Sequence, residues 1–189
     1  MATKKRIKSP LVTLNGIDTK PAKEIFVEEL AASEKSLNKG QRKVLSAFGS
    51  YQEIPEQRGT DFASRGMAVI ERMVFKNNRK TNQTFLYYGA KEIPALFRQA
   101  KVGSTVSLPL SLTLYANPVE AQKHTSANGF VLIVQEAIAV PVDSEDNQEA
   151  LAYVLGPEAE LKIESIERIT WANGSLISKG VSVFTTVMQ

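Results

Sequence analysis

The side chains best suited to chemistry in this chain are cations and aromatic rings that alternate between residues 58 and 101. Nine Lys and Arg residues lie there against three acidic residues. The basic segment 75–80 (Phe-Lys-Asn-Asn-Arg-Lys) is followed closely by the aromatic segment 85–88 (Phe-Leu-Tyr-Tyr). Proteins hold single-stranded nucleic acid with this combination, because cations track phosphates while exposed rings stack on bases. The spacing therefore predicts a nucleic-acid surface, and a covering helix or a second protomer is the alternative explanation of the rings.

Residues that could carry catalysis are few. The chain has no cysteine and a single histidine, His124, which excludes thiolate nucleophiles and histidine-based metal clusters. It contains no Gly-x-Ser-x-Gly elbow, no Walker-type phosphate loop and no Gly-x-Gly-x-x-Gly turn. Glu71 and Glu136 are flanked by apolar residues and are candidates for buried carboxylates, although a salt bridge or an edge position explains them better. We therefore expect a protein that is not an enzyme and uses no cofactor or metal.

The charge of the chain is distributed unevenly. Residues 1–101 carry 19 Lys and Arg against 10 Asp and Glu, whereas residues 102–189 carry 4 against 10. Such a division favours nucleic acid or another acidic partner, with an ordinary solvated surface as the alternative. No apolar run is long enough for a membrane span or a signal peptide. We therefore expect a cytoplasmic protein of a bacterial or phage-infected cell.

The elements that position these residues follow from hydrophobic spacing. Phe26, Leu30 and Leu37 predict a helix that begins near residue 18 and ends near Gly40, with a second short helix after it. Alternation of apolar and polar residues predicts strands, clearest at 104–115. The full set of predicted strands is 69–76, 84–88, 104–115, 130–140, 161–171 and 180–187. A helix is predicted at 90–101, a loop at 116–128, and a hairpin turn at Asn173-Gly174.

The order of elements from residue 66 to 140 resembles the bacterial and phage single-stranded-DNA-binding proteins of the OB-fold type. The resemblance rests on segment 82–89 (Asn-Gln-Thr-Phe-Leu-Tyr-Tyr-Gly), the helix after it, and segment 101–106 (Lys-Val-Gly-Ser-Thr-Val). It implies that Tyr115, Lys123 and His124 belong to a loop that grips DNA. The family typically ends in an acidic tail, whereas this chain ends in apolar residues and carries its acidic segment internally, at 143–149.

These observations combine into one expected architecture and function. We expect a mainly β protein with short helices: a basic arm and helical extension at 1–60, then an OB-fold-like five-stranded barrel with a C-terminal hairpin at 61–189. Its expected function is non-enzymatic binding of single-stranded DNA in replication, recombination or protection. We expect the protein to be encoded by a phage or mobile element and to form a homo-oligomer. The expected contacts are Arg72, Lys76, Arg79, Lys80 and Lys123 to phosphates, Phe85, Tyr87 and Tyr115 to bases, and His124 in the gripping loop. The alternative is a β-sandwich virion or structural subunit whose basic arm faces nucleic acid, and a hydrolase is a distant third.

Overall fold

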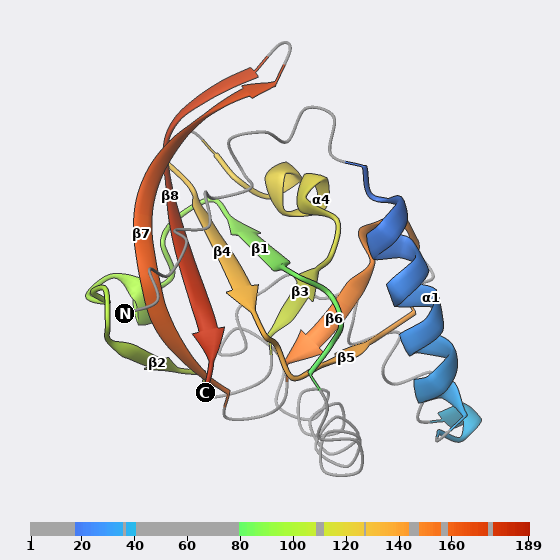
Figure 1. Cartoon of the computed structure of the whole chain (residues 1–189). Helices are drawn as coiled ribbons and strands as arrows, with labels where there is room; N and C mark the ends of the chain where they lie inside the picture. The colour runs from blue at the N-terminus through green and yellow to red at the C-terminus, as the bar shows by residue number, and fades with distance from the viewer. Residues whose placement is uncertain are drawn as a thin grey trace, which may run out of the picture.

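The protein is built on one strongly twisted sheet (Figure 1). The computed structural model describes residues 18–35, 37–40, 80–108, 112–126, 128–143, 148–155, 159–173 and 176–189. Eight strands of this part form the sheet in the order β2-β7-β8-β4-β1-β3-β6-β5. They are β1 (Leu86–Ala90), β2 (Thr105–Ser107), β3 (Thr113–Tyr115), β4 (Phe130–Gln135), β5 (Ala139–Pro141), β6 (Ala152–Leu155), β7 (Glu160–Asn173) and β8 (Leu176–Met188). The sheet is mixed, because β4 and β8 pair in parallel and the other neighbours pair antiparallel.

Two α-helices and two single turns of 3₁₀-helix accompany the described strands. They are α1 (Lys20–Glu34), α4 (Pro118–Lys123), η3 (Ala95–Phe97) and η4 (Gln148–Ala150). Helix α1, blue in Figure 1, lies beside β5 and β6, and α4 packs against β1 and β3. Pro21 is tolerated in the first turn of α1 because the backbone N–H that it lacks would have no partner within the helix.

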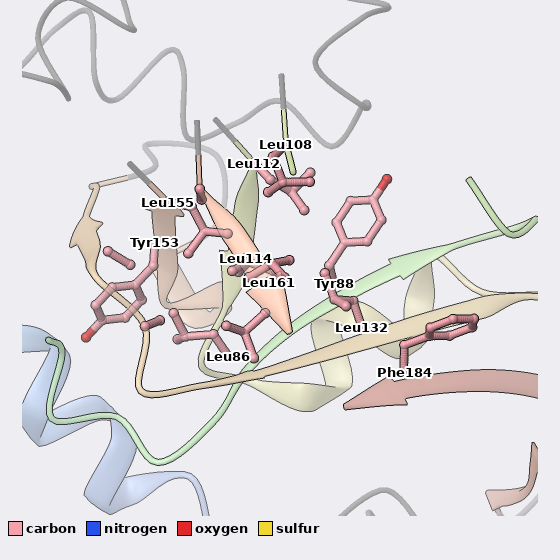
Figure 2. Packing of buried hydrophobic residues seen from close by; sticks show 14 of the residues in the cluster. Leu86, Tyr88, Leu108, Leu112, Leu114, Leu132, Tyr153, Leu155, Leu161 and Phe184 are labelled. Atoms are coloured by element: carbon pink, nitrogen blue, oxygen red, sulfur yellow. The ribbon is translucent and has the colours of Figure 1, made fainter. Parts of the chain in front are cut away.

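One face of the sheet carries the larger core. Phe97, Phe130 and Phe184 meet there with ring centroids 5.0–5.8 Å apart. Leu86 and Tyr153 continue this layer toward α1, as Figure 2 shows. Strand residues one position away point to the opposite face, as the two-residue period of a strand requires.

The opposite face is also covered. Tyr87, Val131 and Ile133 cluster there with Ala121 of α4. The helix approaches β1 closely because β1 has a glycine at the contact: a Cβ on Gly89 would collide with the carbonyl oxygen of Ala121. The absence of a side chain at Gly89 therefore fixes where α4 lies on the sheet.

The mainly β character with short helices is confirmed, but the five-stranded OB barrel is wrong. The alternating segment 104–115 does not form one strand: β2 pairs with β7, while β3 pairs with β1 and β6. The predicted strand at 130–140 is divided into β4 and β5, because Glu136 between them adopts a positive φ of 52°. A period-two pattern specifies which residues face the core, and it does not specify which strand each segment pairs with.

Other local predictions have mixed outcomes. The helix near residue 18 is confirmed as α1, although it ends at Glu34 and not near Gly40, and the C-terminal hairpin is confirmed as β7–β8. The predicted helix at 90–101 is reduced to η3, and the predicted loop at 116–128 contains α4. The strand predicted at 69–76 and the second short helix lie outside the described residues. The division of the chain at residue 60 stays a prediction.

Candidate functional site

Two separate pockets are lined in part by α1, and we refer to the pair as the α1 cleft. The first, the Glu149 pocket, has a volume of about 270 Å³. Its described lining residues are Lys23, Phe26, Val27, Leu30, Val142, Asp143, Gln148, Glu149, Leu151 and Ala152. The second, the Phe85 pocket, has a volume of about 180 Å³. Its described lining residues are Asp18, Thr19, Pro21, Ala22, Ile25, Gln83, Thr84, Phe85, Tyr87, Ala116 and Pro118.

An ion pair crosses the Glu149 pocket. Lys23 Nζ on α1 lies 3.2 Å from Glu149 Oε1 on η4. Both side chains are largely exposed, at 55% and 77%, so the pair contributes about 1 kcal/mol or less to folding. Because the pair is weakly held, both charges remain available to a ligand in the pocket.

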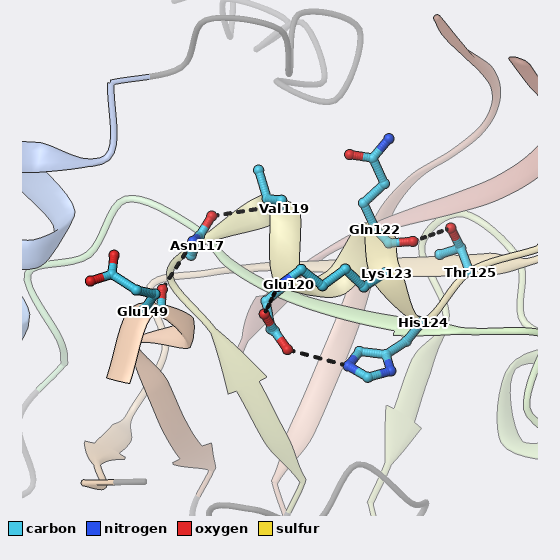
Figure 3. A network of polar contacts seen from close by, with 8 residues as sticks. All are labelled: Asn117, Val119, Glu120, Gln122, Lys123, His124, Thr125 and Glu149. Atoms are coloured by element: carbon cyan, nitrogen blue, oxygen red, sulfur yellow. Dashed lines mark hydrogen bonds and ion pairs between the residues drawn. The ribbon is translucent and has the colours of Figure 1, made fainter. Parts of the chain in front are cut away.

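Asn117 fixes the main chain at Glu149. Its Nδ2 donates to the Glu149 carbonyl oxygen at 2.9 Å, and its Oδ1 accepts from the Val119 N–H at 3.1 Å, which caps α4 (Figure 3). The N–H of Ala116 also donates to the Leu151 carbonyl oxygen, at 2.9 Å. The corner between β3 and α4 therefore holds the segment that carries Glu149.

A buried polar network fastens α1 to the sheet. The Tyr153 hydroxyl of β6 donates to Glu29 Oε2 of α1 at 2.8 Å and accepts from Gln83 Nε2 at 3.1 Å. Glu29 also accepts from the Thr81 hydroxyl, at 2.7 Å, and from the Asn82 N–H, also at 2.7 Å. Burial, and then the Glu29 carboxylate, raise the pKa of Tyr153 above its ordinary range. The network keeps the wall of both pockets in place.

The Phe85 pocket combines rings with one carboxylate. Phe85 is half-buried and Tyr87 is buried, with their ring centroids 6.4 Å apart. Burial raises the pKa of the Tyr87 hydroxyl, so it stays protonated in ordinary buffers. Asp18 stands at the beginning of α1, where its Oδ1 accepts from the Lys20 N–H at 3.0 Å. Asp18 is the one charged side chain among the described residues that line this pocket.

A third group of polar residues surrounds α4. The buried carboxylate of Glu120 lies 3.0 Å from Lys123 Nζ and 3.5 Å from His124 Nε2 (Figure 3). The His124 ring stacks on the Tyr115 ring with centroids 6.5 Å apart. These contacts are internal to the corner between β3 and α4. Over the described residues, no group of three or more His, Asp and Glu side chains is arranged to hold a metal ion.

The structure disperses the residues predicted to contact nucleic acid. Phe85 and Tyr87 share the Phe85 pocket, and Tyr115, Lys123 and His124 gather at α4. Lys80 lies elsewhere, paired with Glu136 at 3.3 Å. Tyr87 and Tyr115 are 5% and 1% exposed, so neither ring presents a stacking face to solvent. Arg72, Lys76 and Arg79 lie outside the described residues, and a ligand contact at any of the nine stays a prediction.

The residues of the Glu149 pocket were missed by sequence reasoning. Lys23 and Glu149 lie 126 positions apart and belong to ordinary charged segments, so no local spacing joins them. Asn117 did carry a signal, since Asn followed by Pro is typical of the beginning of a helix. Glu136 is exposed and paired with Lys80, so it is a salt-bridge partner and not a buried carboxylate.

Comparison with known proteins places the fold. No protein-family model and no curated protein sequence matches the chain. Among solved structures, it is similar to Plx2a, an ADP-ribosyltransferase toxin from Paenibacillus larvae, with a TM-score of 0.68 and 14% identity over 92% of this chain and 97% of that chain. It is similar to the Clostridium limosum C3 exoenzyme, with a TM-score of 0.63 and 12% identity over 92% and 96% of the two chains. Vis toxin, an ADP-ribosyltransferase from Vibrio splendidus, gives a TM-score of 0.56 and 13% identity over 95% and 89%.

These likenesses correct several expectations. They overturn the resemblance to OB-fold single-stranded-DNA-binding proteins, and with it the expected non-enzymatic DNA-binding function and the expected nucleic-acid partner. The alternative, a β-sandwich structural subunit, is not supported either. The expectation of a protein that is not an enzyme falls with them, because proteins named as ADP-ribosyltransferases share the fold. None of the described helices has the length and apolar character that a membrane crossing would need. The chain has the fold of the ADP-ribosyltransferases.

Proposed function

We propose that the chain binds a nicotinamide dinucleotide in the α1 cleft and transfers its ADP-ribose moiety to an acceptor. The observation that carries this proposal is the fold, which is shared with named ADP-ribosyltransferases over more than nine-tenths of the chain. The cleft adds support. Each pocket alone is smaller than the roughly 300 Å³ at which small-molecule sites begin, and only the two together approach the size of a dinucleotide site.

The lining of the cleft suits the parts of such a dinucleotide. Lys23 offers a cation to the diphosphate, and Phe26, Val27 and Leu30 offer apolar contacts to a ring or a ribose. On binding, Lys23 would exchange its contact with Glu149 for a phosphate oxygen. This exchange costs little free energy because the Lys23–Glu149 pair is exposed.

Glu149 is our candidate for the group that assists transfer. The bond from ribose C1′ to the nicotinamide nitrogen breaks with its electron pair leaving on nicotinamide, while an acceptor atom bonds to C1′ and loses a proton. Positive charge develops on the ribose during such a step, and a nearby carboxylate stabilises it, as in glycoside cleavage. Glu149 reaches the pocket from a segment that Asn117 and Ala116 hold in place.

A second candidate function is dinucleotide binding without catalysis. One observation favours it: the strands beneath the cleft contribute Tyr87 and Ala152, and none of the described strand residues that line it is charged. Glu149 is 77% exposed, so water would weaken its effect on a developing charge. The two candidates differ in chemistry and share the same binding site.

Release of nicotinamide from the dinucleotide tests the proposal. We expect release by the wild-type protein and a rate at least about 100-fold lower for Glu149→Gln, the order found when one electrostatic stabiliser is removed. Glu160→Gln is the matched control, because Glu160 is an exposed β7 carboxylate that does not line either pocket. Binding without release would establish the second candidate, and equal rates in both variants would remove Glu149 from the chemistry.

A further inference from the structure

The long hairpin of β7 and β8 reaches beyond the rest of the sheet. On its outer side β7 pairs with β2 at residues 160–162, and β8 pairs with β4 from Ser182 to Val187. Residues 169–173 and 176–181, which we call the hairpin tip, pair only with each other among the described strands. At about 3.3 Å per strand residue the tip is about 17–20 Å long, and Figure 1 shows it projecting past the other strands.

Both faces of the hairpin tip carry apolar residues. Residues opposite each other in an antiparallel pair share a face, and successive residues of a strand alternate between the two faces. Asn173 is opposite Leu176, so Trp171 shares a face with Leu176. Ala172 is opposite Ile177, and these two occupy the other face. A partner that covered only one face would therefore leave apolar residues uncovered on the other.

The ionisable side chains of this part of the sequence are all basic. From residue 168 to residue 189 the chain contains Arg168 and Lys179 and no Asp or Glu. Arg168 stands at the base of the tip, opposite Ser182, and Lys179 belongs to the tip itself. Basic residues beside an apolar segment favour an anionic surface, and each one near a membrane with acidic lipids raises the affinity roughly fivefold.

An anionic lipid surface fits these features better than a folded protein partner. Lipid surrounds an inserted hairpin on both faces, whereas a shallow protein surface covers one. Tryptophan is enriched at the boundary between lipid and water, where Trp171 would lie. The outer backbone groups of a two-stranded ribbon need hydrogen bonds, which the hydrated headgroups supply and the acyl core does not. The expected insertion is therefore shallow, within about 5–10 Å of the boundary between headgroups and acyl chains.

We propose that the hairpin tip inserts into the surface of membranes that contain acidic lipids. Trp171, Leu176 and Ile177 are the inserted apolar residues, and Lys179 contacts lipid phosphate. The tip is distinct from the α1 cleft, because none of the described residues that line either pocket belongs to β7 or β8. The inference goes beyond the proposed function and holds whether or not the chain binds a dinucleotide.

Trp171 is the only tryptophan of the chain, so tryptophan fluorescence reports on the tip alone. The full chain, without dinucleotide, is titrated with phosphatidylcholine vesicles that contain about 30% phosphatidylserine, and with vesicles of phosphatidylcholine alone. We expect the emission to move to shorter wavelength and to be quenched by brominated acyl chains, with at least about tenfold tighter binding to the acidic vesicles. An unchanged spectrum, or equal affinity for the two kinds of vesicle, would overturn the proposal. A shift that grows with protein concentration in the absence of lipid would also overturn it, because the tip would then meet a second copy of the chain.

Two variants separate the apolar contribution from the charged one. Leu176→Ser should weaken binding to the acidic vesicles at least about fivefold, since one apolar residue fewer leaves water. Lys179→Ala should reduce the preference for acidic vesicles about fivefold. Val102→Ser is the matched control, because Val102 is 63% exposed and lies outside the tip, and it should leave binding unchanged. Wild-type affinity in Leu176→Ser, or a loss of binding in Val102→Ser, would overturn the proposal, and the quenching of Trp171 in the wild-type protein tests it without any variant.

Discussion

Two buried hydroxyl groups lie on neighbouring strands, and deleting one should lower the free energy of unfolding whereas deleting the other should raise it. Tyr153 of β6 has a hydroxyl with two partners, Glu29 and Gln83. Thr113 of β3 has a fully buried hydroxyl with no hydrogen-bond partner among the described residues. The two positions are adjacent, because Thr113 pairs with Val154 across the strands. Tyr153→Phe therefore removes a satisfied hydroxyl, and Thr113→Val removes an unsatisfied one.

The size of each change in the free energy of unfolding follows from the hydrogen-bond partners of the hydroxyl group. A hydrogen bond to a charged group contributes about 1.5–3 kcal/mol, so Tyr153→Phe should lower the free energy of unfolding by about 2–3 kcal/mol. A buried hydroxyl without a partner costs about 1–3 kcal/mol, so Thr113→Val, which keeps the shape of the side chain, should raise that free energy by about 1 kcal/mol. Valine also suits the strand.

Urea unfolding measures both changes under one condition. With a denaturant slope of about 2–3 kcal/mol per molar, the midpoint should fall by about 1 M for Tyr153→Phe and rise by about 0.4 M for Thr113→Val. Ser107→Ala, which removes an exposed hydroxyl from β2, is the control and should not shift the midpoint measurably. A loss of stability in Thr113→Val comparable to that in Tyr153→Phe would refute the assignment of these contacts.

Three further predictions concern the walls of the cleft. Gly89→Ala should lower the free energy of unfolding by about 3 kcal/mol or more by thermal or urea unfolding, because its Cβ meets the backbone of α4, which cannot move aside without losing packing. Burial raises the pKa of both Tyr87 and Tyr153, so above about pH 10 the unfolded chain releases protons that the folded chain keeps. The free energy of unfolding should therefore fall above that pH by up to about 1.4 kcal/mol per pH unit for each tyrosine. A Tyr87→Phe variant should show a shallower fall in urea midpoints between about pH 9 and 11.5. Lys23→Ala should leave the free energy of unfolding, measured with urea, within about 1 kcal/mol of wild type, because its ion pair is exposed, and a larger loss would mean that the pair holds α1.

The sequence predicted those elements whose apolar residues recur with a regular local spacing. The apolar spacing around Phe26 located α1, and the run of β-prone residues at the C-terminus located β7 and β8. The mainly β class followed from the same patterns. Local patterns succeed here because periodicity reflects which side of an element is buried.

The local sequence patterns do not predict which distant segments pair with each other. Val106 and Leu114 belong to one alternating run, yet β2 and β3 lie at different places in the sheet. The aromatic residues at 85–88 were interpreted as a nucleic-acid surface, whereas both faces of β1 are covered and Tyr87 and Tyr88 are buried. The α1 cleft depends on contacts such as Lys23 with Glu149, and nothing local to either residue indicates its partner.

Binding of a dinucleotide in the α1 cleft is tested most directly by calorimetric titration of the full chain with NAD, in wild type and in Lys23→Ala, at two salt concentrations. We expect one-to-one binding that weakens with salt, and an affinity at least about fivefold lower in Lys23→Ala, since one charge contact to the diphosphate is lost. Lys91→Ala, an exposed cation outside both pockets, should match wild type. No binding of NAD by the wild-type protein, or equal binding by the Lys23→Ala variant, would contradict the placement of a dinucleotide in the α1 cleft.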